Sequence, residues 1–395
     1  MNHQPECNLT RRQFLRAAGM AATAAALGMP GPAQGALPIE VIDTRVVSRE
    51  PQYYHGWPTL TRRRNGDLLL VCSGGRQDHV CPFGRVELMV SHDNGQTWCW
   101  PQVLIDSPID DRDAGALETA KGSLLVTTFT SLAYEGILAD ARRKKPGEPG
   151  AWPAGQLEQW EAADNRLNAE QRQAEVGEWV IRSTDGGITW SERYPTIVSS
   201  PHGPVQLADG RLLYAGKQLW TKQRRVGVCE SLDDGQSWRW LAEIPARPGD
   251  IQRHYHELHA VETGDSRIIV HLRNLNETNF EETLQTESAD GGKSWSVPHV
   301  IGWGIPSFLL RLRSGKLLMT YGYRRAPFGN QARLSNDWGR TWSDPLIISS
   351  DGPSKDLGYP STVEFDDGSL LTAWYELMKG SSHAVLRVAR WRLKG

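Results

Sequence analysis

Residues 231–238 read SLDDGQSW, and four other stretches repeat the pattern Ser-x-Asp-x-Gly-x-Ser/Thr-Trp. These copies are SHDNGQTW at 91–98, STDGGITW at 183–190, SADGGKSW at 288–295 and SNDWGRTW at 335–342. A second repeat alternates with the octapeptides, with glycine turns beside Leu-rich or β-branched runs at residues 66, 122, 210, 264, 315 and 368. Turns of this kind between strand-like runs indicate antiparallel hairpins. A four-stranded unit of roughly 50 residues is typical of a propeller blade, so we predict an all-β, six-bladed β-propeller.

Two units depart from this pattern. The sixth begins near residue 358 and lacks an octapeptide, so we expect residues 38–47 (PIEVIDTRVV) to supply its outer strand and close the ring. The second is longer because residues 134–178 form a charged stretch with helical propensity. We interpret this stretch as an insertion between the second and third strands of its blade. Both a lid over the site and a solvated decoration remain open for it.

The composition limits the possible functions. A formal net charge of −2 gives no reason to expect a nucleic-acid partner. The five cysteines have no metal-like C-x-x-C spacing, and we expect no cofactor and no metal. A disulfide between Cys72 and Cys81 stays open as an alternative.

The first 35 residues resemble a twin-arginine export signal. Arg11 and Arg12 precede an apolar run at 17–27 and a small-residue cleavage site near Ala36. The run is too short and too rich in alanine to span a bilayer stably. We therefore expect one mature domain, residues 36–395, exported by a bacterium to the periplasm or the medium.

The octapeptides and the glycine turns share one rim of the predicted propeller. In a four-stranded antiparallel blade, the loops after strands one and three lie on the same face. Asp and Ser side chains can hydrogen-bond a tight turn, and Trp can pack between sheets. Five copies spread around a ring cannot converge on one ligand, so we interpret them as scaffold. The functional site is expected on the opposite rim.

Ionisable and aromatic residues gather where first strands begin and second strands end. The candidates at this rim are His55, Arg76, Asp78, His79, Arg112, Asp113, His202, His256, Glu257, His259, Arg273, Arg324, Tyr359 and Glu376. For Arg112 and Asp113, a substrate contact and a local ion pair are both open. The five histidines at 55, 79, 202, 256 and 259 are predicted to contact substrate, and together they leave a bound metal ion as an alternative.

Five such octapeptides on six blades resemble the sialidase (neuraminidase) superfamily, with Asp-box (BNR) repeats, over nearly the whole chain after residue 35. The resemblance implies a tyrosine nucleophile, here Tyr359 in LGYPSTVEFDDG, activated by Glu257. Asp78 is the nearest match for the acid/base aspartate. A neutral phenol avoids the repulsion that a carboxylate nucleophile would meet at an anomeric carbon bearing its own carboxylate. With an unperturbed pKa near 10, the phenol needs a neighbouring base.

The resemblance also implies arginines that hold the substrate carboxylate. Arg273 and Arg324 match two of the three, and Glu376 matches a glutamate that steadies an arginine. The third arginine is missing, because its place reads Gly56-Trp57-Pro58; Arg76 is the candidate to replace it.

The first hypothesis is therefore an exo-acting, retaining exo-α-sialidase-like hydrolase that removes a terminal acidic sugar from a glycan or glycoconjugate. A second hypothesis, favoured by the missing arginine, is a glycosidase or lyase for another sugar, uronic or neutral. A third, of a different class, is a propeller that binds glycans without turnover.

Overall fold

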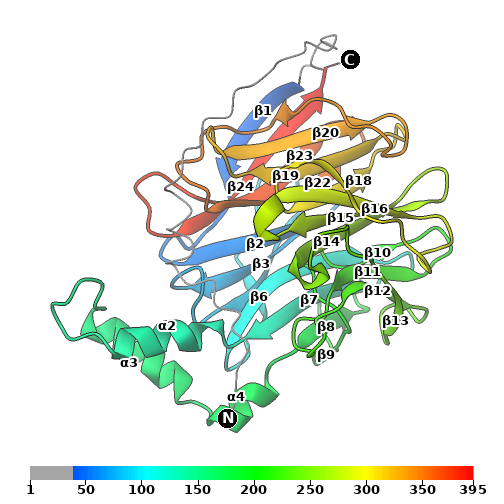
Figure 1. The fold of residues 1–395 in the computed structure, drawn as a ribbon. Coiled ribbons are helices and arrows are strands. Elements are labelled where there is room, and N and C mark those ends of the chain that lie inside the picture. Colours follow the sequence, from blue (N-terminus) through cyan, green and yellow to red (C-terminus); the bar gives the residue numbers. More distant parts are fainter. Residues whose placement is uncertain (1–38, 395) are drawn as a thin grey trace.

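Six four-stranded antiparallel sheets surround a central axis in the computed structural model, which describes residues 39–394 (Figure 1). In five of the sheets the first strand of the unit lies at one edge and the later strands follow outward in chain order; in the sixth, β1 takes the outermost place. The prediction of a six-bladed β-propeller is confirmed. The predicted export signal lies outside the described residues.

The strands divide among the blades as the two repeats predict. Blade 1 contains β2 (Tyr54–Arg62), β3 (Leu68–Arg76), β4 (Arg85–Ser91) and β5 (Gln102–Ile105). Blade 2 contains β6 (Asp110–Glu118), β7 (Leu124–Ser131), β8 (Glu178–Ser183) and β9 (Tyr194–Pro195). Blade 3 contains β10 (Val205–Gln206), β11 (Leu212–Lys217), β12 (Val226–Ser231) and β13 (Arg239–Glu243).

The remaining blades repeat the arrangement. Blade 4 contains β14 (Tyr255–Glu262), β15 (Ile268–Asn274), β16 (Glu282–Ser288) and β17 (His299–Trp303). Blade 5 contains β18 (Ser307–Arg311), β19 (Leu317–Tyr323), β20 (Gly329–Ser335) and β21 (Leu346–Ile347). Blade 6 contains β22 (Leu357–Glu364), β23 (Leu370–Leu377), β24 (Ala384–Leu393) and β1 (Ile39–Val46). One 3-10 turn, Gln252–His254, precedes β14, and a second, Glu277–Asn279, lies between β15 and β16.

The ring closes through β1, as predicted from residues 38–47. This strand pairs antiparallel with β24, from Ile39 opposite Leu393 to Val46 opposite Arg387. The outer strand of blade 6 therefore comes from the start of the described chain, and its neighbour comes from the end.

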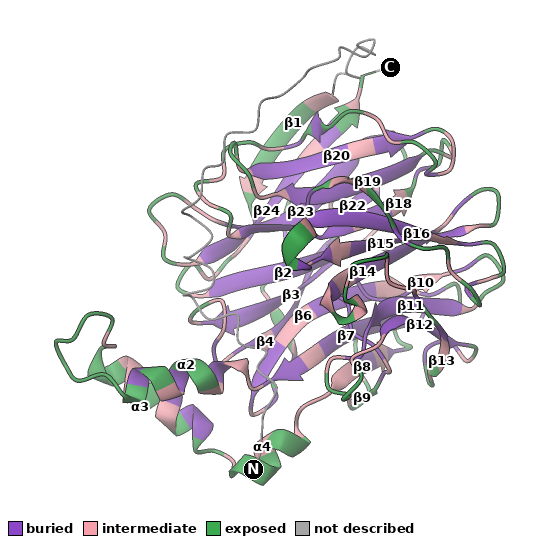
Figure 2. Cartoon of the chain, viewed as in Figure 1, coloured by how far each residue is buried: buried purple, intermediate pink, exposed green. Residues whose placement is uncertain are grey.

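The strands of the sheets are mostly buried (Figure 2), and clusters of apolar side chains fill the spaces between blades. One buried cluster joins blades 1 and 6 and includes Leu60, Leu70, Leu371 and Leu386. Every residue of β3 is buried, because a propeller sheet has a neighbouring sheet on each face.

The octapeptides form the turns between third and fourth strands and hold themselves together. In the third copy the Ser231 hydroxyl donates to Asp233 at 2.8 Å, and the amide and hydroxyl of Ser237 donate to the same carboxylate at 2.9 and 2.5 Å. The corresponding hydrogen bonds from Thr189 lower the pKa of Asp185. Trp98 of the first copy packs into the cluster between blades 1 and 6. The scaffold interpretation is consistent with these contacts.

The long segment of blade 2 is helical and leaves the sheets between β7 and β8 (Figure 1). It contains α2 (Ala133–Arg142), α3 (Ala154–Asp164) and α4 (Ala169–Ala174). Its inner face packs on the loop that follows β3, where Trp160 Nε1 and Gln159 bind the amide of Gln77 at 2.9 and 2.8 Å. The insert therefore braces the loop that carries Asp78. Within residues 39–394, no helix is long and apolar enough to cross a membrane.

The possible disulfide between Cys72 and Cys81 does not form. Both thiols are free and buried in different environments. Cys72 lies in β3 opposite Glu87, whereas Cys81 packs with Tyr134, Leu138 and Trp160 beneath the insert.

Removing one octapeptide carboxylate tests its scaffold role. Asp233→Ala removes three hydrogen bonds, and we expect the free energy of unfolding to fall by about 1–3 kcal/mol. Urea denaturation measures this loss. Asp344→Ala, at an exposed position, is the matched control and should leave the midpoint unchanged. An unchanged midpoint for Asp233→Ala would contradict the scaffold role.

Candidate functional site

A bulge near the start of the innermost strand builds the site. The pairing of first and second strands shifts register between Gly56 and Thr59, Arg112 and Gly115, His256 and His259, and Gly358 and Ser361. Inside each shift, one non-glycine residue adopts a left-handed conformation. These residues are Trp57 (φ 52°), Asp113 (φ 51°), Glu257 (φ 47°) and Tyr359 (φ 55°).

Such conformations cost about 1–3 kcal/mol each and cluster at functional sites. Because all four residues occupy the same position of their blades, the bulges bring four chemically different side chains to one end of the central axis. Blade 3 has Gly203 (φ 75°) at this position, where its Cα packs against Gly115 and leaves no space for a side chain.

Tyr359 and Glu257 are in direct contact. The tyrosine hydroxyl donates a short hydrogen bond to Glu257 Oε1. Arg273 Nη1 donates to both oxygens of Glu257 at 2.8 and 2.6 Å and lies 3.4 Å from the tyrosine hydroxyl. The structure thus brings together the three residues that the sequence proposed as nucleophile, base and arginine.

The protonation of this pair follows from its surroundings. Burial and the charge of Glu257 raise the pKa of Tyr359 well above 10, so the phenol is neutral. Burial alone would raise the pKa of Glu257, but the charge and hydrogen bonds of Arg273 hold it below its usual value. Glu257 is therefore an ionised acceptor beside a neutral hydroxyl.

Asp113 is a second carboxyl group at this end of the axis. Burial raises its pKa to about 7, against the opposing charge of Arg112, and the charge of Glu257 raises it further. The charge of Asp113 in turn raises the pKa of Tyr359. Two carboxyls whose environments push their pKa values apart are typical of an acid/base pair.

One of the arginines near the site is buried in an ion pair, and two others are partly exposed and could contact a ligand. Arg76 is fully buried and binds Asp110 at 2.7 Å, so it does not replace the missing arginine as a substrate contact in this arrangement. Arg324 is half-buried, lies 5.7 Å from the Tyr359 ring and donates to Tyr375 Oη at 3.4 Å. Arg112 is also partly exposed and lies 4.7 Å from the Trp57 ring.

Trp57 occupies the region from which an arginine is missing. Its indole is buried, with the guanidinium of Arg76 5.0 Å away and the ring of Tyr359 6.4 Å away. The guanidinium groups of Arg76 and Arg112 both interact with the Trp57 ring. These cation–π interactions offset part of the cost of holding two positive charges close together.

Asp78, the predicted acid/base, lies outside this group. It is exposed, and its Oδ1 accepts the backbone amide of His79 at 2.7 Å. The structure thus gives Asp78 the role of a loop cap and places Asp113 nearer to the tyrosine pair.

The other predicted contacts are buried or bound to neighbouring side chains. His55, His202 and His259 are buried, which removes them from direct contact with a ligand in this conformation. His256 Nε2 lies 3.0 Å from Lys217 Nζ. Glu376 does bind an arginine, but it is Arg387, at 3.0 Å on the outer side of blade 6, and not an arginine of the site.

Sequence reasoning missed one polar cluster. Asp356 accepts hydrogen bonds from the hydroxyls of Tyr54 and Tyr375 at 3.0 and 3.1 Å, and His79 Nδ1 lies 3.4 Å from the same carboxylate. Asp356 lies three residues before Tyr359, just outside the LGYP motif that pointed to the tyrosine. The single available signal was its place at the start of a first strand.

The fold and the Tyr359–Glu257–Arg273 group define a sialidase-like six-bladed propeller. A family model described as a BNR repeat-like domain matches residues 152–371, and the chain belongs to this family. No curated protein matches the chain.

Solved structures share the fold at low sequence identity. A Dyadobacter fermentans protein of unknown function is 21% identical, with a TM-score of 0.71, over 90% of this chain and 99% of that one. A mutant of the NanB sialidase from Streptococcus pneumoniae is 15% identical, with a TM-score of 0.59, over 90% and 70%. A Penicillium chrysogenum α-L-arabinanase complexed with arabinobiose is 11% identical, with a TM-score of 0.58, over 88% and 98%. The resemblance to the sialidase superfamily is confirmed, and the fold is that of glycosidases.

The raised pKa of Asp113 makes stability depend on pH. A carboxyl whose pKa is about 7 when folded and near 3.9 when unfolded contributes stability that is lost as pH rises between these values. We expect Asp113→Asn to be more stable relative to the wild type at pH 8 than at pH 5. Thermal unfolding at both pH values measures the difference. An equal effect at both would show that the Asp113 carboxyl is not perturbed.

Proposed function

We propose that this protein is a retaining exo-glycosidase that uses Tyr359 as nucleophile, Glu257 as its base and Asp113 as acid/base. The observation that carries the proposal is the direct contact between a neutral tyrosine hydroxyl and a carboxylate held ionised by Arg273. A phenol needs such a partner to act as a nucleophile near neutral pH.

In the first step, Tyr359 Oη bonds to the anomeric carbon while the glycosidic C–O bond breaks. The phenolic proton passes to Glu257, and the leaving oxygen takes the proton of Asp113. Arg273 moderates the change of charge, because it contacts both the carboxylate and the hydroxyl. In the second step, water gives a proton to Asp113 and attacks the anomeric carbon, and Tyr359 leaves with the proton from Glu257. Two displacements retain the anomeric configuration.

The proposed substrate is a terminal sugar with a carboxylate, such as a sialic acid. A neutral nucleophile suits an anomeric carbon that carries a negative group. Arg324 beside the Tyr359 ring and Arg112 beside Asp113 are the available guanidinium groups for that carboxylate. Arg324 also lines a small pocket together with Trp303 and Arg325.

One observation favours a second candidate, a neutral terminal sugar. Arg76 forms a buried ion pair with Asp110, and Trp57 fills the region of the missing arginine. The site therefore has fewer cationic side chains available to a substrate than the resemblance implies.

We also propose export by the twin-arginine pathway to the periplasm or the medium. The support is the order of twin arginines, apolar run and small residues within residues 1–35.

Removal of one oxygen atom tests the nucleophile. Tyr359→Phe should lower kcat on a 4-methylumbelliferyl sialoside by at least about 10³-fold, because the ring still packs but cannot form the glycosyl intermediate. Tyr194→Phe, which removes a hydroxyl from the outer strand of blade 2, is the matched control and should retain activity. Equal activity of Tyr359→Phe and wild type would rule out the tyrosyl mechanism. Turnover limited to neutral aryl glycosides in a substrate panel would favour the second candidate.

The acid role of Asp113 predicts a pH profile. Asp113 must be protonated to assist the leaving group, so kcat/KM should fall as pH rises through about 7. In Asp113→Asn this alkaline limb should disappear, and activity should fall least for aryl glycosides with good leaving groups. Asp78→Asn is the paired variant. If it, and not Asp113→Asn, shows this dependence on the leaving group, the assignment of the acid/base residue is wrong.

A further inference from the structure

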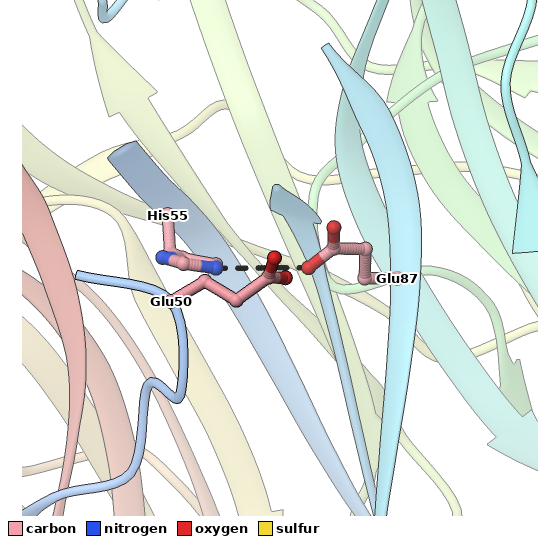
Figure 3. Close-up of side chains that lie close together, drawn as sticks. All are labelled: Glu50, His55 and Glu87. Carbon is pink, nitrogen blue, oxygen red and sulfur yellow. Dashed lines mark ion pairs between the residues drawn. The ribbon is translucent and has the colours of Figure 1, made fainter. Parts of the chain in front are cut away.

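A buried polar group lies in blade 1, apart from the four axial residues. His55 of β2, Glu87 of β4 and Glu50 of the segment before β2 point toward one another (Figure 3). One ligand atom from each lies within 4.8 Å of the other two. His55 Nε2 is 3.6 Å from Glu87 Oε2, which is beyond hydrogen-bond distance.

The polar atoms of this group lack partners. Both side chains of the His55–Glu87 pair are 1% exposed or less. His55 Nε2 makes no hydrogen bond, and Glu87 Oε2 makes none either. Buried polar atoms are nearly always satisfied, so two orphaned atoms that lie 3.6 Å apart indicate a missing partner between them.

The charge of the group identifies the partner as a cation. An imidazole nitrogen that carries no proton offers a lone pair to a cation. Arg85 Nε binds Glu87 Oε1 at 2.6 Å, and Arg85 Nη2 is 3.7 Å from Glu50. One guanidinium thus balances one of the two carboxylates, and a net negative charge remains.

The local backbone leaves room for the second oxygen of Glu87. A Cβ at Gly74 would lie 2.2 Å from Oε2, so any larger residue would displace the carboxylate from His55. Glu50 is 23% exposed in its side chain and provides a path from solvent.

We propose that His55 Nε2, Glu87 Oε2 and a Glu50 oxygen bind a divalent transition metal, with zinc as the best match. Two ligands of a tetrahedral zinc ion about 2.1 Å away lie roughly 3.4 Å apart, close to the spacing of His55 and Glu87. One nitrogen and two carboxylate ligands favour zinc over calcium, which takes six to eight oxygen ligands. A fourth position is left for water.

Such an ion would connect three segments of the rim. It would fix the chain before β2 to β2 and β4, and thereby hold Tyr54, the residue beside His55, whose hydroxyl binds Asp356. The proposal departs from the expectation of a chain without metal. It corresponds to the alternative of a bound metal ion, with His55 as the single histidine ligand.

The test measures metal content of the full chain. Wild-type protein is stripped with a chelator, dialysed against zinc, manganese or calcium separately, and assayed by inductively coupled plasma mass spectrometry. We expect one zinc per chain and a higher melting temperature with zinc. Glu50→Gln should weaken zinc affinity by at least about tenfold, a loss typical of a perturbed metal site. His55→Gln should abolish stoichiometric binding.

Matched variants distinguish this site from surface binding. Glu148→Gln and His92→Gln change an exposed glutamate and an exposed histidine, and both should bind zinc as the wild type does. No stoichiometric zinc in the wild type, or unchanged affinity in Glu50→Gln, would overturn the proposal. Calcium bound in preference to zinc would overturn the ligand assignment. Because Glu50→Gln keeps its side-chain volume at a partly exposed position, its result does not depend on a folding defect.

Discussion

The site depends on one backbone device, the bulge that turns a residue of an innermost strand into the left-handed region. A regular strand would send alternate side chains into the sheets on either side, where apolar packing fills the space. The extra residue breaks this alternation and directs Trp57, Asp113, Glu257 and Tyr359 along the axis. The cost of four strained residues is met by the surrounding sheets, whose central strands are buried on both faces.

The bulges also explain which parts of the site were predictable. The two repeats predicted the blades, the closing strand and the position of the insert, because glycine turns and octapeptides are local signals with a fixed period. Tyr359, Glu257 and Arg273 were found through motifs that lie at corresponding places in their blades. Asp113 lies at the same place, but a left-handed conformation has no sequence signature for a non-glycine residue. Its electrostatic coupling to Tyr359 therefore became visible only in the structure.

The predicted site residues that the structure places outside the site have a common physical feature. Position at the correct rim does not determine whether a side chain is exposed. Arg76 lies at the predicted strand end, yet its guanidinium is buried against Asp110. His202 packs against His259 and Phe308, and Glu376 binds Arg387 of the neighbouring strand β24. Partner choice of this kind depends on side chains more than 30 residues away in some cases, which no local pattern records.

The pairing of β1 with β24 has a consequence for how the molecule forms. Residue 39 lies opposite residue 393, so the ring closes at a seam between two strands that lie far apart in the chain. The other five blades can form from contiguous segments, but blade 6 is complete only when β1 pairs with β24. Contacts of such long range are the slowest to form. Until then the partly built ring presents unpaired strand edges, the state in which this chain is most exposed to association with other copies.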